Sequence, residues 1–231
     1  SDVYKRQVYE SATALLANSD ESAKYLAEWL NKKKQIFVIP PAVCLETVDN
    51  ARPDERFFPP PEGRRFVLWS ARSADYKKSD LVARIVWDYP EQLDLVAIGK
   101  PKFQVTDTDK HRAYVYTGCS DRMKFYLMKR AELVLAPSLF EGFGMVPMEA
   151  LACGTPVVAV KTSALPEVVS EGKDGILLPD YDEKKFAQAV IKLLANKKQL
   201  QRYRTYAVVK ARKRFDWEKV TRKLEQELKR L

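Results

Sequence analysis

Short apolar segments recur along the chain and alternate with segments whose apolar residues are spaced as in an amphipathic helix. The apolar segments predict seven strands, at 14–19, 35–40, 65–70, 93–99, 113–118, 132–138 and 156–160, and an eighth at a sheet edge, at 175–179. Helices are predicted at about 20–33, 79–88, 121–130, 146–152, 165–171, 182–195 and 197–230, the last broken near Asp216. This alternation is typical of parallel strands joined by crossover helices.

The predicted strands are continuously apolar rather than alternating, as in LDLVAIG at 93–99. Strands of this kind have both faces covered, because an exposed face would carry polar residues at every second position. The pattern therefore predicts an α/β fold: a Rossmann-like parallel sheet with helices on both faces.

A connector divides the chain. The segment 51–65 contains four prolines and mixed charges, which predicts an extended linker or hinge near 40–64. The part before it is too small to form a core by itself and is typical of the end of a preceding domain. Because the chain begins with Ser1 rather than Met, we expect that an N-terminal part of a longer protein is missing and that residues 1 to about 7 are disordered.

Composition narrows the function classes. Hydrophobic residues make up 46% of the 231, which argues against disorder, and no segment approaches the roughly 18 apolar residues of a membrane-spanning helix. The net charge of +9 favours partners that carry phosphate, whether nucleotides, nucleic acids or anionic lipids. Cys44, Cys119 and Cys153 form no C-x-x-C pair, which predicts reduced thiols in a cytoplasmic protein.

The segment 136–160 carries the most specific pattern: a strand, a glycine-containing loop, a short helix and a second strand. Ligands of open α/β sheets bind beyond the carboxyl ends of the strands, so the loop 138–145 is the expected ligand position. Gly142 and Gly144 would let backbone N–H groups approach a ligand closely. Pro147 suits the first turn of a helix, whose N-terminus offers unpaired donors and a positive dipole end to a phosphate.

Glu141 lies in this loop, and Glu149 lies inside the predicted helix that follows it. Carboxylates there could accept hydrogen bonds from sugar or ribose hydroxyls. The alternative is an ordinary loop acid and an acid favoured by the helix dipole, which by itself would explain Glu149. Both interpretations remain open on the residues alone.

The segment EGFGMVPMEALACGTPVVA resembles the Glu-x7-Glu segment of glycosyltransferase family 4, retaining enzymes of the GT-B fold. FVLWSARSADYKKSDL at 66–81 is similar to that family's strand followed by an Arg and a Lys, and SALPEVVSEGKDGILLPD at 163–180 to the segment after the motif. The resemblance implies three parts of the chain. Residues 1–34 would be a remnant of the acceptor domain and residues 35–205 the nucleotide-sugar-binding domain. Residues 206–231 would form helices that pack back towards the N-terminal domain.

The resemblance also implies roles for individual residues. Arg72 and Lys78 would clamp the donor diphosphate, with Lys77 as an alternative to Lys78, and Glu141 would hold hydroxyls of the transferred sugar. The remaining donor-binding residues would be Gly142, Phe143, Gly144 and Met145 through the backbone, Glu149 at the ribose, and Ser120 within the nucleobase edge at 119–122. The family's glycines are replaced by Ala71, Ser79 and residues 162–164, which affects loop geometry.

The resemblance implies no metal cofactor. The DTD tripeptide at 107–109 matches the metal-binding pattern of other transferases, but it lies in a charged loop rather than at the end of a buried strand. We interpret the metal site as the lesser alternative. His111, the only histidine, lies among charged loop residues and is expected to be solvent-exposed.

The leading expectation is a hexosyltransferase that uses a nucleoside-diphosphate sugar, inactive as this chain alone, with an unknown glycan, lipid-linked or small-molecule acceptor. It would be cytoplasmic, with possible peripheral contact at the inner membrane surface and no nucleic-acid partner. The alternatives are a non-catalytic nucleotide-binding or interaction domain of the same fold, and a basic nucleic-acid-binding protein, for which no motif is found. The apolar residues of the C-terminal stretch are expected to face the core: Tyr203, Tyr206, Val209, Phe215 and Trp217.

Overall fold

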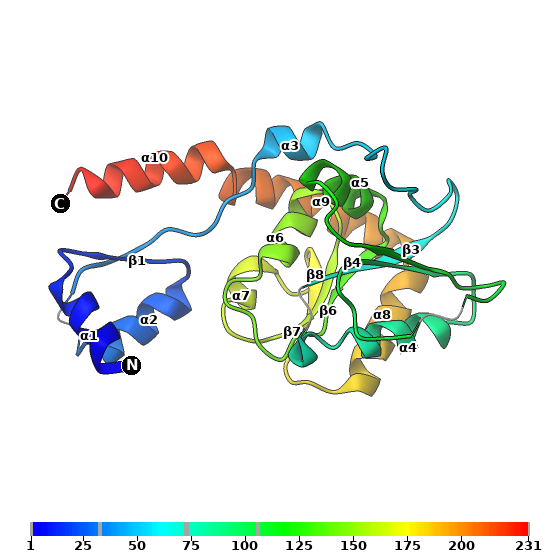
Figure 1. Cartoon of the computed structure of the whole chain (residues 1–231), viewed down its shortest axis with the longest axis horizontal. Helices are drawn as coiled ribbons and strands as arrows, with labels where there is room; N and C mark the ends of the chain where they lie inside the picture. Colours follow the sequence, from blue (N-terminus) through cyan, green and yellow to red (C-terminus); the bar gives the residue numbers. More distant parts are fainter. Residues whose placement is uncertain (1, 32–33, 72–73, 105–106, 231) are drawn as a thin grey trace.

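The structure is a computed structural model that describes residues 2–31, 34–71, 74–104 and 107–230. It contains a small N-terminal unit and a larger α/β domain, connected by a linker and by a long C-terminal helix pair (Figure 1). The N-terminal unit consists of α1 (Asp2–Ser11), β1 (Leu15–Ala17), α2 (Asp20–Trp29) and β2 (Ile36–Val38), with β1 and β2 paired in parallel.

The prediction of disorder for residues 1 to about 7 is wrong, because Asp2–Ser11 forms a helix. Two interactions support it. Arg6 forms an ion pair with Glu10 one turn later at 3.0 Å, and the ring of Tyr9 packs edge-on against Trp29 of α2 at 5.7 Å between centroids.

The linker leads from β2 through α3 (Leu45–Asp49) to the large sheet. β2 pairs with β1 and not with the large sheet. Val43 in the linker pairs with the chain at the junction of the last two helices: its N–H donates to Phe215 O at 2.8 Å, and its carbonyl accepts from Trp217 N at 3.1 Å.

The large sheet has six parallel strands in the order β5-β4-β3-β6-β7-β8. Their bounds are β3 Phe66–Ala71, β4 Asp94–Gly99, β5 Ala113–Tyr116, β6 Leu133–Ala136, β7 Val157–Val160 and β8 Gly175–Leu178. The predicted strands are therefore confirmed, including the eighth at an edge. From β3 the chain moves outward to β4 and β5, and from β6 it moves in the opposite direction to β7 and β8.

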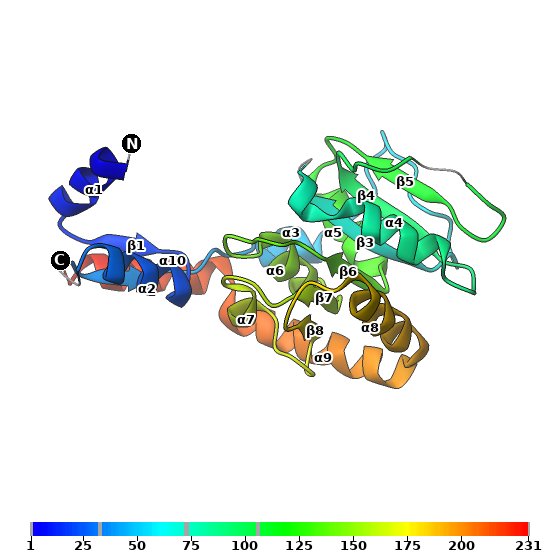
Figure 2. The same ribbon diagram turned by 90° about the horizontal axis from the view of Figure 1, so that it is seen from below.

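Helices cover both faces of this sheet, as predicted (Figure 2). They are α4 (Ser79–Trp87), α5 (Asp121–Arg130), α6 (Met145–Ala152), α7 (Leu165–Val168), α8 (Glu183–Ala195), α9 (Lys197–Arg214) and α10 (Trp217–Leu228), with a 3-10 turn η1 (Asp75–Lys77). Along β3, Phe66 and Leu68 join a core with α5 and α6, while Val67 and Trp69 join a core with α4 and α8. The alternation of the strand thus divides the apolar residues between two layers.

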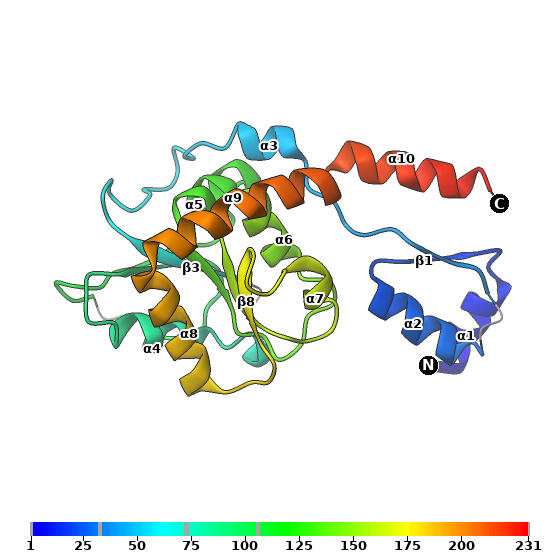
Figure 3. The same ribbon diagram turned by 180° about the vertical axis from the view of Figure 1, so that it is seen from behind.

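Figure 3 shows α9 lying along the domain and α10 continuing from it beside the N-terminal unit. The predicted break near Asp216 is confirmed, and this carboxylate caps α10 by accepting from Glu218 N at 3.2 Å. The predicted boundary at residue 206 falls inside α9, which continues to Arg214. Among the described helices, none has the length and apolar character needed to cross a membrane.

The predicted apolar stripe of the C-terminal helices is only partly correct. Tyr203 and Phe215 are buried, but Tyr206, Val209 and Trp217 are exposed by 38%, 65% and 60%. The buried face of α9 consists instead of residues spaced by three or four: Leu200, Tyr203, Ala207 and Ala211. Small alanines face the domain because α9 packs closely against α6.

Candidate functional site

The site lies where the order of the sheet reverses, between β3 and β6. The loops that follow these two neighbouring strands meet at the same edge, because parallel strands place their carboxyl ends together. A backbone hydrogen bond joins the two loops, from Leu139 N after β6 to Tyr76 O in the turn after β3, at 2.9 Å. This is the topological switch point at which doubly wound folds bind ligands.

Glu141 and Lys77 face each other across this junction. Lys77 Nζ lies 2.5 Å from Glu141 Oε1, and the two side chains are exposed by only 16% and 14%. Each charge therefore loses part of its hydration and is compensated by the other. Lys77, the alternative to Lys78 as a diphosphate ligand, is thus the lysine that lies beside Glu141.

Lys78 lies elsewhere. It has a left-handed backbone (φ 51°) at the start of α4, and its ammonium group lies 5.3 Å from the centroid of the Tyr181 ring. Arg72, the other predicted phosphate ligand, lies outside the described residues.

The N-terminus of α6 follows the loop directly. Gly144 caps it with φ 93°, and a Cβ there would lie 2.5 Å from Leu165 Cδ2, so both backbone and space favour glycine. Within the described part of the chain, the backbone N–H groups of Phe143, Gly144 and Met145 have no protein acceptor. The Phe143 side chain is buried and packs edge-on against Phe215, which anchors the loop to the end of α9.

Gly142 lies in open space, since a Cβ there would meet no atom within 4 Å. The three predicted backbone donors at 143–145 and the open Gly142 thus form one continuous segment next to Glu141. Ser163, at a position where the resemblance leads us to expect glycine, has a positive φ of 45°. Residues other than Gly and Asn rarely adopt this backbone conformation.

Glu149 lies in the second turn of α6 and is paired with a residue that the sequence did not indicate. Its Oε1 lies 2.8 Å from Lys124 Nζ of α5, which also contacts Asp121 at 2.9 Å. Burial raises the pKa of the Glu149 carboxyl, and Lys124 opposes this only in part. Burial lowers the pKa of Lys124, but Glu149 and Asp121 outweigh it and raise that pKa above its usual value.

Ser120 caps α5, where its hydroxyl accepts from Met123 N at 3.2 Å. With Arg122 it borders a cavity of about 660 Å³ whose other wall is the linker, through Arg52, Asp54 and Arg56. Arg56 binds Asp54 with both ends of its guanidinium group and holds the pKa of that carboxyl well below its usual range. The sequence did not indicate that the linker would approach the predicted nucleobase edge.

His111 is buried rather than exposed, and the prediction is wrong. Its ring nitrogen Nδ1 lies 2.8 Å from Leu93 O, and the Trp87 ring packs against it at 6.1 Å between centroids. In the DTD tripeptide, the Asp107 carboxylate accepts from Ala113 N at 3.2 Å and thereby holds the loop that enters β5. Among the described residues, no cluster of three or more His, Cys, Asp or Glu has the arrangement of a metal site.

The structure is a doubly wound α/β domain with a cluster of charged side chains at its switch point. The chain belongs to the family of glycosyl transferases group 1, which matches residues 51–209. The D-inositol 3-phosphate glycosyltransferase of Mycolicibacterium smegmatis is 30% identical over 206 residues, which cover 83% of this chain and 48% of that protein. The chain spans about half the length of the curated relatives it matches.

Solved structures show the same fold. Sucrose-phosphate synthase from Thermosynechococcus elongatus superposes with a TM-score of 0.83 at 23% identity, over 99% of this chain and 60% of that one. Anabaena HepE in complex with UDP and glucose superposes with a TM-score of 0.79 at 18% identity, over 100% of this chain and 66% of that one. The GT-B type of Rossmann-like fold is thereby confirmed.

Proposed function

We propose that this chain is the donor-binding part of a retaining glycosyltransferase of family 4, which transfers a hexose from a nucleoside-diphosphate sugar. We further propose that it is inactive without an acceptor-binding part. The observation that carries the proposal is the Lys77–Glu141 pair, 2.5 Å apart at the switch point. It lies beside a helix N-terminus whose N–H groups have no acceptor among the described residues. Because HepE was solved with UDP and glucose, UDP is the first nucleotide to test.

The charges suit the chemistry of transfer. When the bond between sugar and diphosphate breaks, negative charge accumulates on the leaving nucleoside diphosphate. Lys77, with Arg72 and Lys78 nearby in the sequence, would stabilise that charge more strongly as the bond breaks than before. The N–H groups at 143–145 would bind phosphate or sugar oxygens at the positive end of the α6 dipole.

The Lys77–Glu141 pair would be exchanged when the donor binds. The diphosphate would take over Lys77, and the hydroxyls of the sugar would take over the Glu141 carboxylate. Lys77 would then be paired with the diphosphate charge, and the Glu141 carboxylate would keep hydrogen bonds from the hydroxyls.

The nucleoside would bind along α5 and the linker. Glu149 is held by Lys124 and would accept hydrogen bonds from ribose hydroxyls. The base would occupy the cavity of about 660 Å³ beside Ser120. The guanidinium groups of Arg52 and Arg56 on its far wall could stack on an aromatic base.

We propose that no metal takes part, because the lysines supply the countercharge that a divalent cation would otherwise provide. The acceptor is unspecified, since the residues that would bind it belong to the other half of the cleft. Free thiols at Cys44, Cys119 and Cys153 support a cytoplasmic location.

Calorimetric titration of the 231-residue chain with UDP and UDP-glucose, in the presence of EDTA, tests the proposal. The wild type should bind both, and Glu141→Gln should bind UDP within about threefold of wild type but lose roughly tenfold for UDP-glucose, as expected for one charge-assisted hydrogen bond. The control is Glu62→Gln, the same change on an exposed loop residue. Absence of UDP binding at millimolar concentration would overturn the donor site, and a requirement for magnesium would overturn its metal-free part.

A further inference from the structure

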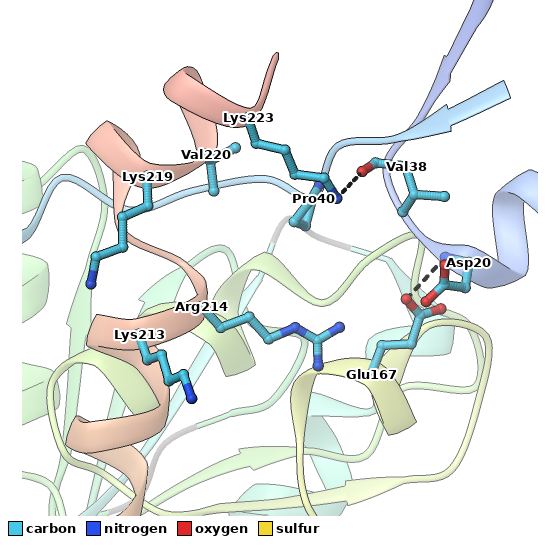
Figure 4. Close-up of a pocket in the computed structure, with 9 residues that line it drawn as sticks. All are labelled: Asp20, Val38, Pro40, Glu167, Lys213, Arg214, Lys219, Val220 and Lys223. Atoms are coloured by element: carbon cyan, nitrogen blue, oxygen red, sulfur yellow. Dashed lines mark hydrogen bonds between the residues drawn. The ribbon is translucent and has the colours of Figure 1, made fainter. Parts of the chain in front are cut away.

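A second charged cavity lies between the C-terminal helices and the N-terminal unit. It has a volume of about 340 Å³, at the small end of the range for sites that bind small molecules. None of the residues that line it belongs to the donor site. Four basic residues and two acidic ones border it: Lys213, Arg214, Lys219, Lys223, Asp20 and Glu167 (Figure 4).

One of the two acidic residues, Glu167, is already engaged in contacts within the protein. The two oxygens of Glu167 accept hydrogen bonds from Asp20 N at 2.9 Å and Glu21 N at 3.1 Å, so this carboxylate caps the start of α2. A carboxylate bound in this way at a helix N-terminus has its charge partly compensated. The cavity is therefore left with an excess of positive charge on its other wall.

Arg214 supplies the part of this excess that has no carboxylate partner among the described residues, and its guanidinium carbon lies 5.3 Å from the centroid of the Phe215 ring. In Figure 4 its side chain points across the cavity towards Glu167, yet no carboxylate in the described part of the chain lies within 4 Å of its guanidinium group. Lys223 lies at the opposite rim and uses one N–H on Val38 O at 2.7 Å, which leaves two N–H groups of its ammonium. Lys219 donates to Arg212 O at 2.8 Å and lies 3.9 Å from the Asp216 carboxylate, so its charge is partly compensated.

Helix dipoles do not account for this arrangement. Basic residues are favoured in the last turn of a helix, which explains Lys213 and Arg214 at the end of α9. Lys219 and Lys223 lie in the first two turns of α10, where the dipole favours acids instead. The bridge between Val43 and Asp216 fixes the break between the two helices, and residues from both sides of the break line the cavity.

We propose that this cavity binds a phosphate-bearing anion, with Arg214 and Lys223 as its main ligands. A guanidinium group forms paired hydrogen bonds with two phosphate oxygens, and an ammonium group provides a point charge for the third. The phosphate comes from either a soluble phosphorylated small molecule or a lipid headgroup. Its binding would tie α10 to the N-terminal unit, since Val38 and Asp20 belong to that unit.

Glycerol 3-phosphate is the probe, and amide chemical shifts of the complete chain are the readout. The proposal predicts saturable shifts at Val38 and Val220, which line the cavity. Arg214→Gln should weaken binding about tenfold or more, the loss expected for charge-assisted hydrogen bonds. Arg222→Gln is the matched control, because Arg222 lies on α10, is paired with Glu218 and does not border the cavity. It should change the affinity by less than twofold.

The Lys77→Met variant tests whether glycerol 3-phosphate binds at the cavity rather than at the donor site. It should leave the amide shifts at Val38 and Val220 unchanged. Sedimentation with phosphatidylcholine vesicles, with and without phosphatidylglycerol, shows whether the phosphate belongs to a lipid headgroup or to a soluble molecule. Vesicle binding that needs Arg214 but not Arg222 indicates a lipid headgroup, and glycerol 3-phosphate binding without vesicle binding indicates a soluble ligand. Absence of saturable shifts, or equal weakening by Arg214→Gln and Arg222→Gln, would overturn the proposal.

Discussion

The α6 site and the cavity beside α10 are both rich in charged side chains, but their charges are arranged in opposite ways. At α6, the pairs Lys77–Glu141 and Lys124–Glu149 are 2.5 and 2.8 Å apart, and all four side chains are exposed by only 14–17%. At α10, the basic residues are exposed, and Arg214 has no carboxylate partner in the described part of the chain.

The difference follows from the cost of burial. A charge that is removed from water needs a partner in the protein, whereas an exposed cation stays hydrated and costs little. Buried pairs therefore fix the shape of a site before any ligand arrives. Exposed cations contribute little to the fold and remain available to an external anion. The stability of the fold and the binding of ligands should accordingly respond to different residues.

The largest expected effect is on stability at the α6 site. Breaking a fully buried ion pair costs about 3–5 kcal/mol, and the partial exposure of Glu149 reduces this, so Lys124→Met should lower the free energy of unfolding by about 2–3 kcal/mol. Urea denaturation at neutral pH measures it. The double variant with Glu149→Gln should recover part of the loss, because no unpaired carboxylate remains.

The matched control is Lys213→Met, the same substitution on an exposed residue of the cavity. It should change the free energy of unfolding by no more than about 0.5 kcal/mol. Equal destabilisation by the two variants would contradict the distinction between buried pairs and exposed cations.

Much of the fold was predictable from the sequence. The strands could be predicted because a sheet covered on both faces needs continuous apolar segments. The helix break at Asp216 could be predicted because an aspartate is a good N-cap. The N-terminal helix was missed because its support comes from Trp29, eighteen residues beyond its end at Ser11. The exposure of Tyr206 and Val209 was missed because alanines, rather than large residues, face α6.

The sequence indicated the loop of the candidate site but not the ion pairs around it. Glycines and a helix start indicated the ligand loop, and the resemblance indicated Glu141 and Glu149. The 3-10 turn and the left-handed backbone of Lys78 determine which of the two lysines approaches Glu141. Neither feature can be recognised from the two adjacent lysines in the sequence. Lys124 was missed because it meets Glu149 only through the packing of α5 on α6.

The next effect is on nucleotide affinity and distinguishes the two lysines. Since Lys77 is the lysine held beside Glu141, Lys77→Met should weaken UDP binding by about 10- to 100-fold, which corresponds to 1.5–3 kcal/mol for a charged hydrogen bond. Lys78→Met should weaken it by less than about threefold. Calorimetry on both variants, with unfolding curves to verify that each is folded, measures the difference. A larger loss for Lys78→Met would assign the phosphate contact to Lys78.

The smallest effect is the dependence of stability on pH. Because burial raises the pKa of the Glu149 carboxyl, the folded protein binds this proton more tightly than the unfolded chain, whose glutamates titrate near pH 4.3. The folded state is therefore favoured below that pH and loses stability as the pH rises towards the folded-state pKa. Asp174, also buried, contributes in the same direction, so the contribution of Glu149 must be isolated.

The difference in unfolding free energy between wild type and Glu149→Gln isolates it. This difference should shift in favour of the variant as the pH rises from about 4 to 7, because only the wild type must then ionise a buried carboxyl. The same difference for Glu62→Gln, on an exposed residue, should stay flat. A shift in the opposite direction would mean that Lys124 more than compensates the burial of Glu149, and the α6 site would then be stabilised by its ion pair rather than merely shaped by it.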